Sequence, residues 1–347
     1  LSRGLGDVYK RQASAYFSIV ATALPIFQFS IFGAGMLRSS GNMVVPSVMS
    51  VVMMSLDVVF NFFLIFPTRP VQLFGAEVTI PGMGMGVVGA AIGTVSAELV
   101  AASITMYILC FRSKELSLRI DTGRFLPTWG VVKRALHISL PMGLQQTIMC
   151  SAYVMTTIII APLGTFAIAA NSFGVIVESL CYMPGYGIAD AATTLVGQSI
   201  GAGRHELMKR FAWLSVGLGV TVMAVMGVVM YVGAPVAMAM MTPAEEVRRL
   251  GVEVLRIEAF AEPMFAAAIV SYGVFVGAAK TLVPSIMNLV SIWGVRISLA
   301  ALLAPSMGLR GVWIAMCIEL CFRGFIFLVK LKFWNIQTSC NHYGKDQ

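Results

Sequence analysis

Long apolar stretches separated by short polar gaps dominate the chain. Each is close to the length of about 20 residues that an α-helix needs to cross a bilayer. The gaps between them are marked by Gly, Pro and charged residues. The pattern therefore predicts an all-α integral membrane protein with nine spanning helices, at residues 14–36, 43–66, 86–111, 136–161, 166–197, 210–233, 252–278, 282–304 and 308–333.

The composition excludes an ordinary soluble protein. Apolar residues make up 58% of the chain, charged residues only 12%, and the mean hydropathy is +0.85, whereas a soluble domain carries about 25% charged residues. The net charge of +8 does not indicate nucleic-acid binding, because the basic residues lie in the short gaps, as they do in membrane proteins. Six cysteines without a CxxC pair predict neither a zinc site nor a disulfide framework.

The charges also predict how the chain crosses the membrane. The gap 112–134 has six basic and two acidic residues, which places it in the cytoplasm. Alternation from there puts the tail 334–347 inside and the N-terminus outside, although residues 1–12 (LSRGLGDVYKRQ) are basic. We therefore expect residues 1–12 to be foreign or misread sequence. The alternative is a genuine but unusual N-terminus.

The first and seventh spans belong to an internal repeat with an offset of 238 residues, which matches Pro25 with Pro263, Pro46 with Pro284 and Ser47 with Ser285. Further on, Met85-Gly86-x-x-Gly89 matches Met307-Gly308-x-x-Gly311. The copies are six spans apart and so run in the same direction. Six spans per copy predict twelve helices, of which three would precede this chain. The expected organisation is 13–111 as the rest of an N-lobe, 112–134 as an interlobe linker and 135–333 as a C-lobe.

Five segments resemble the multidrug and toxic compound extrusion family of antiporters. They are Gly35-Met-Leu-Arg38-Ser-Ser-Gly41-Asn-x-x-x-Pro46, Gly86-Val-Val-Gly89-Ala-Ala-Ile-Gly-Thr94, Leu195-Val-Gly-Gln198-Ser-Ile-Gly201-Ala-Gly203, Leu255-Arg-Ile257 and Gly311-Val-Trp313. The resemblance implies two six-helix lobes around a cleft that opens to one side at a time. It further implies exchange of drugs or organic cations for H⁺ or Na⁺, with no cofactor, in the plasma or inner membrane. The expected partners are lipid and small amphipathic or cationic compounds, and we expect a monomer.

Asp57, Asn61 and Thr94 form the first candidate site. Asp57 and Asn61 are four residues apart and share a helix face, so a carboxylate and an amide can bind a proton or a cation together. In some members of the family the corresponding face has Asn followed by Asp, and Thr94 matches a polar position lining the same pocket. The alternative is a structural hydrogen bond between helices.

The second group lies in the C-terminal half. Charges inside a bilayer are costly and usually face the bundle interior or an aqueous cavity. Glu178 is near the middle of its span, and we expect Pro184 and Gly185 to break that helix. Arg296 resembles a recurrent arginine of the family and is expected to pair with a carboxylate, Glu178 being the candidate.

Other charged residues are weaker candidates. Glu258 and Glu262, just before Pro263, face either the cleft or the outer surface, and Asp190 and Glu98 are further acidic candidates. Glu319 and Arg323 are spaced to pair with each other.

One branch of the family has a glutamate about eight residues after Leu-Pro-x-Gly in its seventh helix. Here Leu140-Pro-Met-Gly143 is followed at that distance by Met149, with Gln145 and Gln146 as the polar residues nearby. The Na⁺ site of that branch is therefore not expected, which favours H⁺ as the coupling ion.

Two other functions remain open. A flippase for lipid-linked sugars of the same superfamily would need a more cationic cleft for pyrophosphate. An intramembrane enzyme would need a catalytic motif, and the sequence has no HExxH or GxSxG and only three histidines. A third possibility is that the chain, without three helices, transports nothing by itself.

Overall fold

The computed structural model describes residues 2–73, 76–113 and 128–334. Most of the predicted interlobe linker 112–134, almost all of the tail 334–347 and Cys340 lie outside the described residues. The chain divides into two compact units, residues 1–125 and 126–347, which we describe one at a time.

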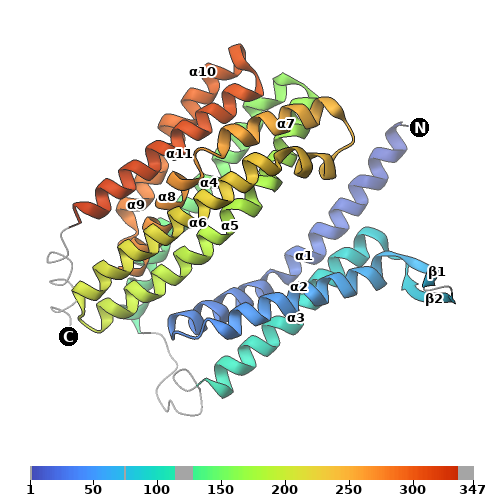
Figure 1. Cartoon of the computed structure of the whole chain (residues 1–347). Helices are drawn as coiled ribbons and strands as arrows, with labels where there is room; N and C mark the ends of the chain where they lie inside the picture. The colour runs from blue at the N-terminus through green and yellow to red at the C-terminus, as the bar shows by residue number, and fades with distance from the viewer. Residues whose placement is uncertain (1, 74–75, 114–127, 335–347) are drawn as a thin grey trace. The chain divides into compact units, whose positions relative to one another are not determined.

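Unit 1 contains three helices and a hairpin (Figure 1). Helix α1 spans Ser2–Ser39, α2 spans Val44–Ile65, and α3 spans Gly86–Tyr107 and continues as the π-helix η1 at Ile108–Arg112. Helix α3 packs against both α1 and α2. Between α2 and α3, the strands β1 (Pro67–Leu73) and β2 (Ala76–Met83) pair antiparallel, where the sequence predicted only a loop.

Unit 2 is a larger helical bundle. It begins with α4 (Trp129–Ile160), the short η2 (Ala161–Leu163), α5 (Thr165–Gly201) and α6 (His205–Met241). It continues with α7 (Glu245–Glu258), α8 (Glu262–Gly277), α9 (Leu282–Leu289), the π-helix η3 (Val290–Ile297), α10 (Ser298–Met307) and α11 (Leu309–Lys332). Helix α8 contacts α5, α6 and α11, so the centre of the unit lies along α8.

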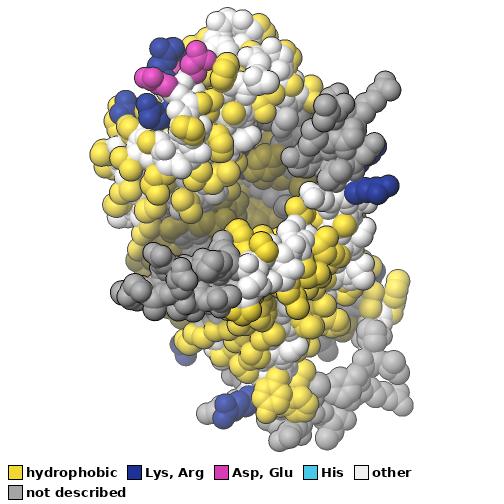
Figure 2. All heavy atoms as spheres, turned by 90° about the vertical axis from the view of Figure 1, so that its right-hand side faces the viewer, with side chains coloured by type: hydrophobic (Ala, Val, Ile, Leu, Met, Phe, Trp, Pro, Cys, Tyr) yellow, Lys and Arg dark blue, Asp and Glu magenta, His cyan; other side chains and the backbone are white. Residues whose placement is uncertain are grey.

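The predicted fold class is confirmed. Within the described residues, eight helices are long and apolar enough to span a membrane, and the pair α7 and α8 makes a ninth span if counted together. Apolar side chains dominate the face seen in Figure 2, as expected for a surface in lipid.

The predicted span 252–278 is bent, because α7 and α8 meet at 60° across a short break. One local prediction was wrong, because α5 runs unbroken through Pro184 and Gly185. Packing explains the continuity of α5, because Gly185 lies against the Met223 side chain of α6, and neighbouring helices allow a membrane helix to tolerate proline.

Small residues bring α8 close to its neighbours. A Cβ on Gly273 would lie 2.6 Å from the carbonyl oxygen of Ala189 on α5, and Gly277, one turn later, is equally close to Thr193. The hydroxyl of Thr193 donates a hydrogen bond to the Gly273 carbonyl, 2.8 Å away. This is the Gly-x-x-x-Gly spacing by which membrane helices pack closely without apolar burial as the driving force.

The internal repeat is visible in the backbone. Gly41 and Ala279, which are 238 positions apart, both have positive φ, 89° and 54°, and Ala279 is the one non-glycine residue with positive φ among the described residues. Gly86 and Gly308, matched in the later part of the repeat, have φ of 55° and 62°. The matched chain reversals therefore share a positive φ.

Side-chain contacts repeat as well. The Ser47 hydroxyl donates to the Met43 carbonyl at 2.8 Å, and the matched Ser285 hydroxyl approaches the Thr281 carbonyl at 2.7 Å. A Cβ on Gly89 would lie 2.5 Å from the Leu64 carbonyl oxygen, and one on the matched Gly311 would lie 2.5 Å from that of Leu303. Helices α1 to α3 and the segment α8 to α11 are thus two copies of one motif.

Candidate functional site: buried acidic residues beside a polar cavity

The break between α7 and α8 places two carboxylates in the protein interior. Glu258 is the last residue of α7 and Glu262 the first of α8, and each is only 1% exposed. None of their four carboxylate oxygens has a hydrogen-bond partner in the described part of the chain. Gly227 of α6 lies against the turn, since a Cβ there would be 2.8 Å from the Ala259 carbonyl oxygen. Both residues therefore face the interior, not the outer surface.

Glu178 of α5 belongs to the same cluster. It is 7% exposed, and its carboxylate interacts electrostatically with Glu258 and Glu262. The positive charges that act on Glu178 are those of Arg296 and Arg323. Because an unpaired charge inside a membrane protein is costly, such a group is a functional candidate by default.

Glu319 and Arg323 supply the ion pair of the cluster. Arg323 Nε lies 3.1 Å from Glu319 Oε1, which also accepts a hydrogen bond of 2.6 Å from the Ser291 hydroxyl. The guanidinium also lies over the ring of Phe265, 5.4 Å from its centroid. The predicted pairing of Glu319 with Arg323 is confirmed.

Arg296 does not pair as predicted. It lies in η3, the π-helical segment between α9 and α10, and its Nη2 contacts the sulfur of Met316 on α11. No ion pair joins it to Glu178 or to any other carboxylate among the described residues. The extra residue of a π-helical turn rotates the following side chains, and such turns are frequent at functional sites, so linear spacing could not place this guanidinium.

A cavity of about 320 Å³ lies beside the cluster in unit 2. Its lining combines amides, hydroxyls and one residue of each charge with methionine and aromatic side chains. The lining residues are Met142, Gln145, Gln146, Met149, Tyr186, Ala189, Asp190, Thr193, Phe265, Ala268, Ile269, Tyr272, Gly273, Val276, Asn288 and Arg323. Polar groups that converge on an apolar wall are typical of small-molecule sites.

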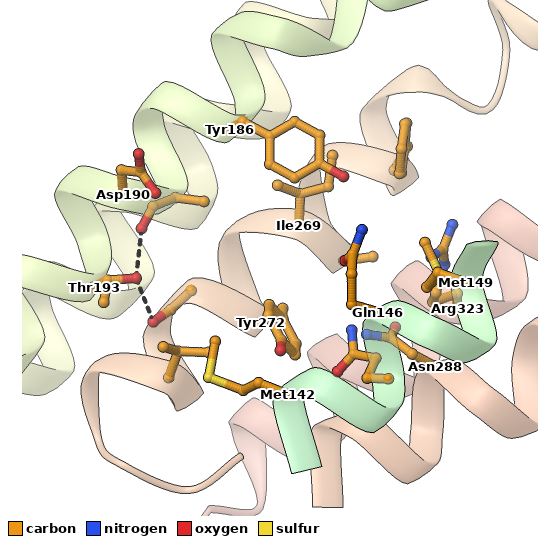
Figure 3. A pocket seen from close by; sticks show the side chains of 16 residues that line it. Met142, Gln146, Met149, Tyr186, Asp190, Thr193, Ile269, Tyr272, Asn288 and Arg323 are labelled. Atoms are coloured by element: carbon orange, nitrogen blue, oxygen red, sulfur yellow. Dashed lines mark hydrogen bonds between the residues drawn. The ribbon is translucent and has the colours of Figure 1, made fainter. Parts of the chain in front are cut away.

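Figure 3 shows how the polar side chains are arranged around this cavity. Asp190 and Thr193 come from α5 on one side, whereas Gln146 of α4 and Arg323 of α11 lie on the other, with Tyr272 of α8 between them. Arg323 thus reaches the cavity and also pairs with Glu319 of the acidic cluster. It is the direct physical link between the cavity and the buried acids.

The candidate site of unit 1 is smaller and less enclosed. Asp57 and Asn61 are both partly buried on α2, and each has an oxygen without a hydrogen-bond partner among the described residues. The amide of Asn61 lies against Gly93 of α3, the residue before Thr94. Asn61 therefore lies at the α2–α3 contact, beside the residue that precedes Thr94.

A separate cavity of unit 1 is not lined by Asp57, Asn61 or Thr94. Its volume is about 50 Å³ and its charged lining residue is Glu98, which is 6% exposed. The acidic candidates of unit 1 therefore lie in two places.

Sequence reasoning missed several contributors to the cavity of unit 2, Tyr272 and Asn288 among them. Tyr272 and Asn288 are an ordinary aromatic and an amide inside apolar spans, and no spacing rule singles them out. A signal was available for Asn288, because it is a buried polar residue in the first half of a span, and buried polar residues need a partner or a function.

Within the described residues, no group of three or more His, Cys, Asp and Glu side chains is arranged to hold a metal ion. The absence of a cofactor stays a prediction.

Known proteins resemble this chain over most of its length. A probable multidrug resistance protein NorM from Thermotoga maritima is 26% identical over 322 residues, which cover 91% of this chain and 66% of that protein. One from Xylella fastidiosa is 29% identical over 68% of this chain and 50% of its own length. The chain thus spans between half and about two thirds of these relatives.

Solved structures share the fold. The outward-facing conformation of a multidrug resistance MATE family transporter of the MOP superfamily superposes with a TM-score of 0.79 at 19% identity, covering 92% of this chain and 68% of that one. A MOP superfamily transporter from Pyrococcus furiosus matches with the same score, identity and coverage.

The helices and these likenesses define a multi-pass α-helical membrane protein with the fold of MATE transporters. Residues 141–302 match the MatE family model. The match covers a little under half of the chain, which is thus similar to the multidrug and toxic compound extrusion (MATE) family.

Proposed function

We propose that this protein is a secondary active exporter of small amphipathic and cationic organic compounds in exchange for H⁺, with Na⁺ as the less favoured alternative for the coupling ion. The observation that carries the proposal is the cluster of Glu178, Glu258 and Glu262, which are buried and form no ion pair with any of the described residues. The cluster lies beside a cavity with a mixed polar and aromatic lining. The match to the MatE family model supports transport as the activity, and the relatives named above are probable multidrug resistance proteins.

Reversible protonation of these acids provides the coupling. When the acids are ionised, the cluster attracts a cationic compound and Arg323. When they are protonated, that attraction is lost. A proton and a cation therefore favour different states of the same site, and the coupling between them is reciprocal. Since Arg323 lies in both the cluster and the cavity wall, it transmits a change of charge from one to the other.

The methionine and aromatic residues of the cavity suit a broad range of substrates. Met142 and Met149 are flexible and polarisable, and Tyr186 and Tyr272 offer ring faces to organic cations. Such surfaces repack around different ligands. A flippase for pyrophosphate-linked sugars is less favoured, because four glutamates outnumber the two arginines in the cluster.

Gradient-driven transport by the purified chain in proteoliposomes tests the proposal. Ethidium transport is measured under a pH gradient, under a Na⁺ gradient and with neither. We expect transport under the pH gradient and a collapse of transport when an ionophore dissipates it. Ethidium movement that is equal with and without either gradient would contradict the proposal.

Asp57 of unit 1 is tested in the same assay. We expect Asp57→Asn to abolish pH-driven transport, because it removes the ionisable group and keeps the shape. A variant that transports as well as the unaltered protein would exclude Asp57 from the coupling.

A further inference from the structure

A second cavity of unit 2 lies outside the acidic cluster, along the turn between α7 and α8. It is a groove of about 360 Å³ between α6, this turn and α11. Its wall is apolar except for the Tyr231 hydroxyl and the Arg256 guanidinium. The wall is formed chiefly by Tyr231, Arg256, Ile257, Phe260, Ile314 and Ile318.

Arg256 is the cation of this groove, and no acidic residue neutralises it. Its side chain is exposed and forms no ion pair with any carboxylate among the described residues. Its guanidinium lies over the ring of Tyr231, 5.2 Å from the centroid, and its Nε is 3.5 Å from the Tyr231 carbonyl oxygen. The terminal nitrogens remain available to an anion.

The position of Arg256 in its span fits the boundary of the bilayer. Arg310, at the start of α11, pairs with Glu253 of α7 at 2.6 Å, and both side chains are partly exposed. Arg256 is three residues after Glu253, about one helical turn further along α7. Ile314 and Ile318 follow Arg310 by about one and two turns. An arginine at this level reaches the polar boundary with its charged end while its stem lies against apolar surface.

We propose that this groove is a specific phospholipid site, in which the lipid phosphate binds Arg256 and an acyl chain lies along Phe260, Ile314 and Ile318. The groove requires a ligand with an anionic group at one end and an apolar chain at the other. Phospholipid is the bilayer component with that chemistry, and arginine binds phosphate through paired hydrogen bonds.

Contacts between the aromatic rings of Tyr231 and Phe260 hold the groove in shape before a lipid binds. Tyr231 and Phe260 meet edge to face with centroids 5.7 Å apart, so the ring that supports Arg256 is itself held by the residue on the turn. Phe260 is 72% exposed, which is unfavourable in water but natural for a side chain covered by an acyl chain.

The lipid would also cover the outer side of the break whose inner side holds Glu258 and Glu262. Cys317 lines the groove and also lies near Glu258. A lipid in the groove and the two buried acids thus contact opposite sides of one turn.

Binding of phosphatidylglycerol to the delipidated full chain in detergent, measured by native mass spectrometry, tests the site. We expect Arg256→Gln to weaken binding by about fivefold, the effect of one cation on a lipid phosphate. Arg249→Gln is the matched control, since Arg249 is exposed on the same helix but does not line the groove. It should bind as the unaltered protein does. Ile318→Trp, which fills the groove and keeps Arg256, should also lose binding.

Two competitors distinguish the parts of the ligand. Diacylglycerol with the same chains lacks the phosphate, and glycerol 3-phosphate lacks the chains, so neither should displace the lipid. Equal retention of phosphatidylglycerol by Arg256→Gln and Arg249→Gln would overturn the proposal, as would displacement by glycerol 3-phosphate at the same concentration as lipid. Thermal melting in lipid-free detergent verifies that each variant is folded.

Discussion

Helices α1 to α3 of unit 1 and the segment α8 to α11 of unit 2 are copies of one motif, yet charge is distributed in them very differently. Glu262, at the start of the second copy, corresponds to Leu24 of the first, and Glu258, just before it at the end of α7, corresponds to Val20 at the same offset. Leu24 is 52% exposed, whereas Glu262 is 1% exposed. The matched position therefore carries an exposed apolar residue in one copy and a buried acid in the other.

The matched prolines of the two copies also differ in their position within a helix. Pro25 lies inside the continuous helix α1, while the matched Pro263 stands at the start of α8, after the 60° break. Proline fits the first turn of a helix and can also be tolerated inside a membrane helix. The difference comes from the surroundings, because the break is packed against Gly227 of α6.

The largest contrast is expected at the matched glycines Gly35 and Gly273. Gly273→Ala should lower stability by about 1–3 kcal/mol, because the added methyl group meets the Ala189 carbonyl at 2.6 Å and forces α8 away from α5. A Cβ added at Gly35 would have no other atom within 4 Å outside its own stretch of helix. Gly35→Ala should therefore leave stability unchanged or raise it by up to about 1 kcal/mol, because alanine has the better helix propensity.

Thermal unfolding of both variants in detergent measures this contrast. Equal losses of stability in the two variants would contradict the packing described for α5 and α8.

A medium effect is expected at the matched serines Ser47 and Ser285. Both hydroxyls meet the carbonyl four residues earlier, but Ser285 Oγ also lies 2.7 Å from Gln145 Oε1 on α4. Ser285→Ala should therefore cost about 1 kcal/mol more than Ser47→Ala, because the partly buried amide of Gln145 loses a partner. The same melting assay applies, and an equal cost in both variants would show that the contact with Gln145 adds no stability.

The smallest effect is expected at Gly41 and Ala279. A positive φ destabilises alanine by about 1 kcal/mol because of its Cβ, whereas glycine adopts a positive φ without this penalty. Gly41→Ala should therefore destabilise the protein, while Ala279→Gly should be neutral or slightly stabilising, because relief of strain is partly offset by the greater freedom of glycine in the unfolded chain. A lower melting temperature for Ala279→Gly would contradict the equivalence of the two turns.

The sequence was sufficient to predict the spans and the repeat, and it was much weaker on the site. Apolar length predicts spans because lipid demands it, and matched prolines and glycines such as Pro46 and Pro284 reveal the repeat. The pairing of Glu319 with Arg323 followed from helical spacing alone.

What could not be predicted depends on tertiary packing. The break before Glu262, the continuity of α5 through Pro184 and the π-helical turn at Arg296 all depend on neighbouring helices. The break and the π-helical turn change the direction in which side chains point. The spacing of residues along the sequence therefore could not predict the contact of Arg296 with Met316 or the position of Arg323 in the cavity wall.

The central claim is that the buried acids Glu178, Glu258 and Glu262 of unit 2 couple an ion gradient to transport. Its most direct test is pH-gradient-driven ethidium transport by Glu262→Gln, with Leu24→Gln at the matched position of the first copy as the control. We predict a loss of at least about tenfold for Glu262→Gln, within the usual range of coupling free energies, and little change for Leu24→Gln. Full pH-driven transport by Glu262→Gln would contradict the claim.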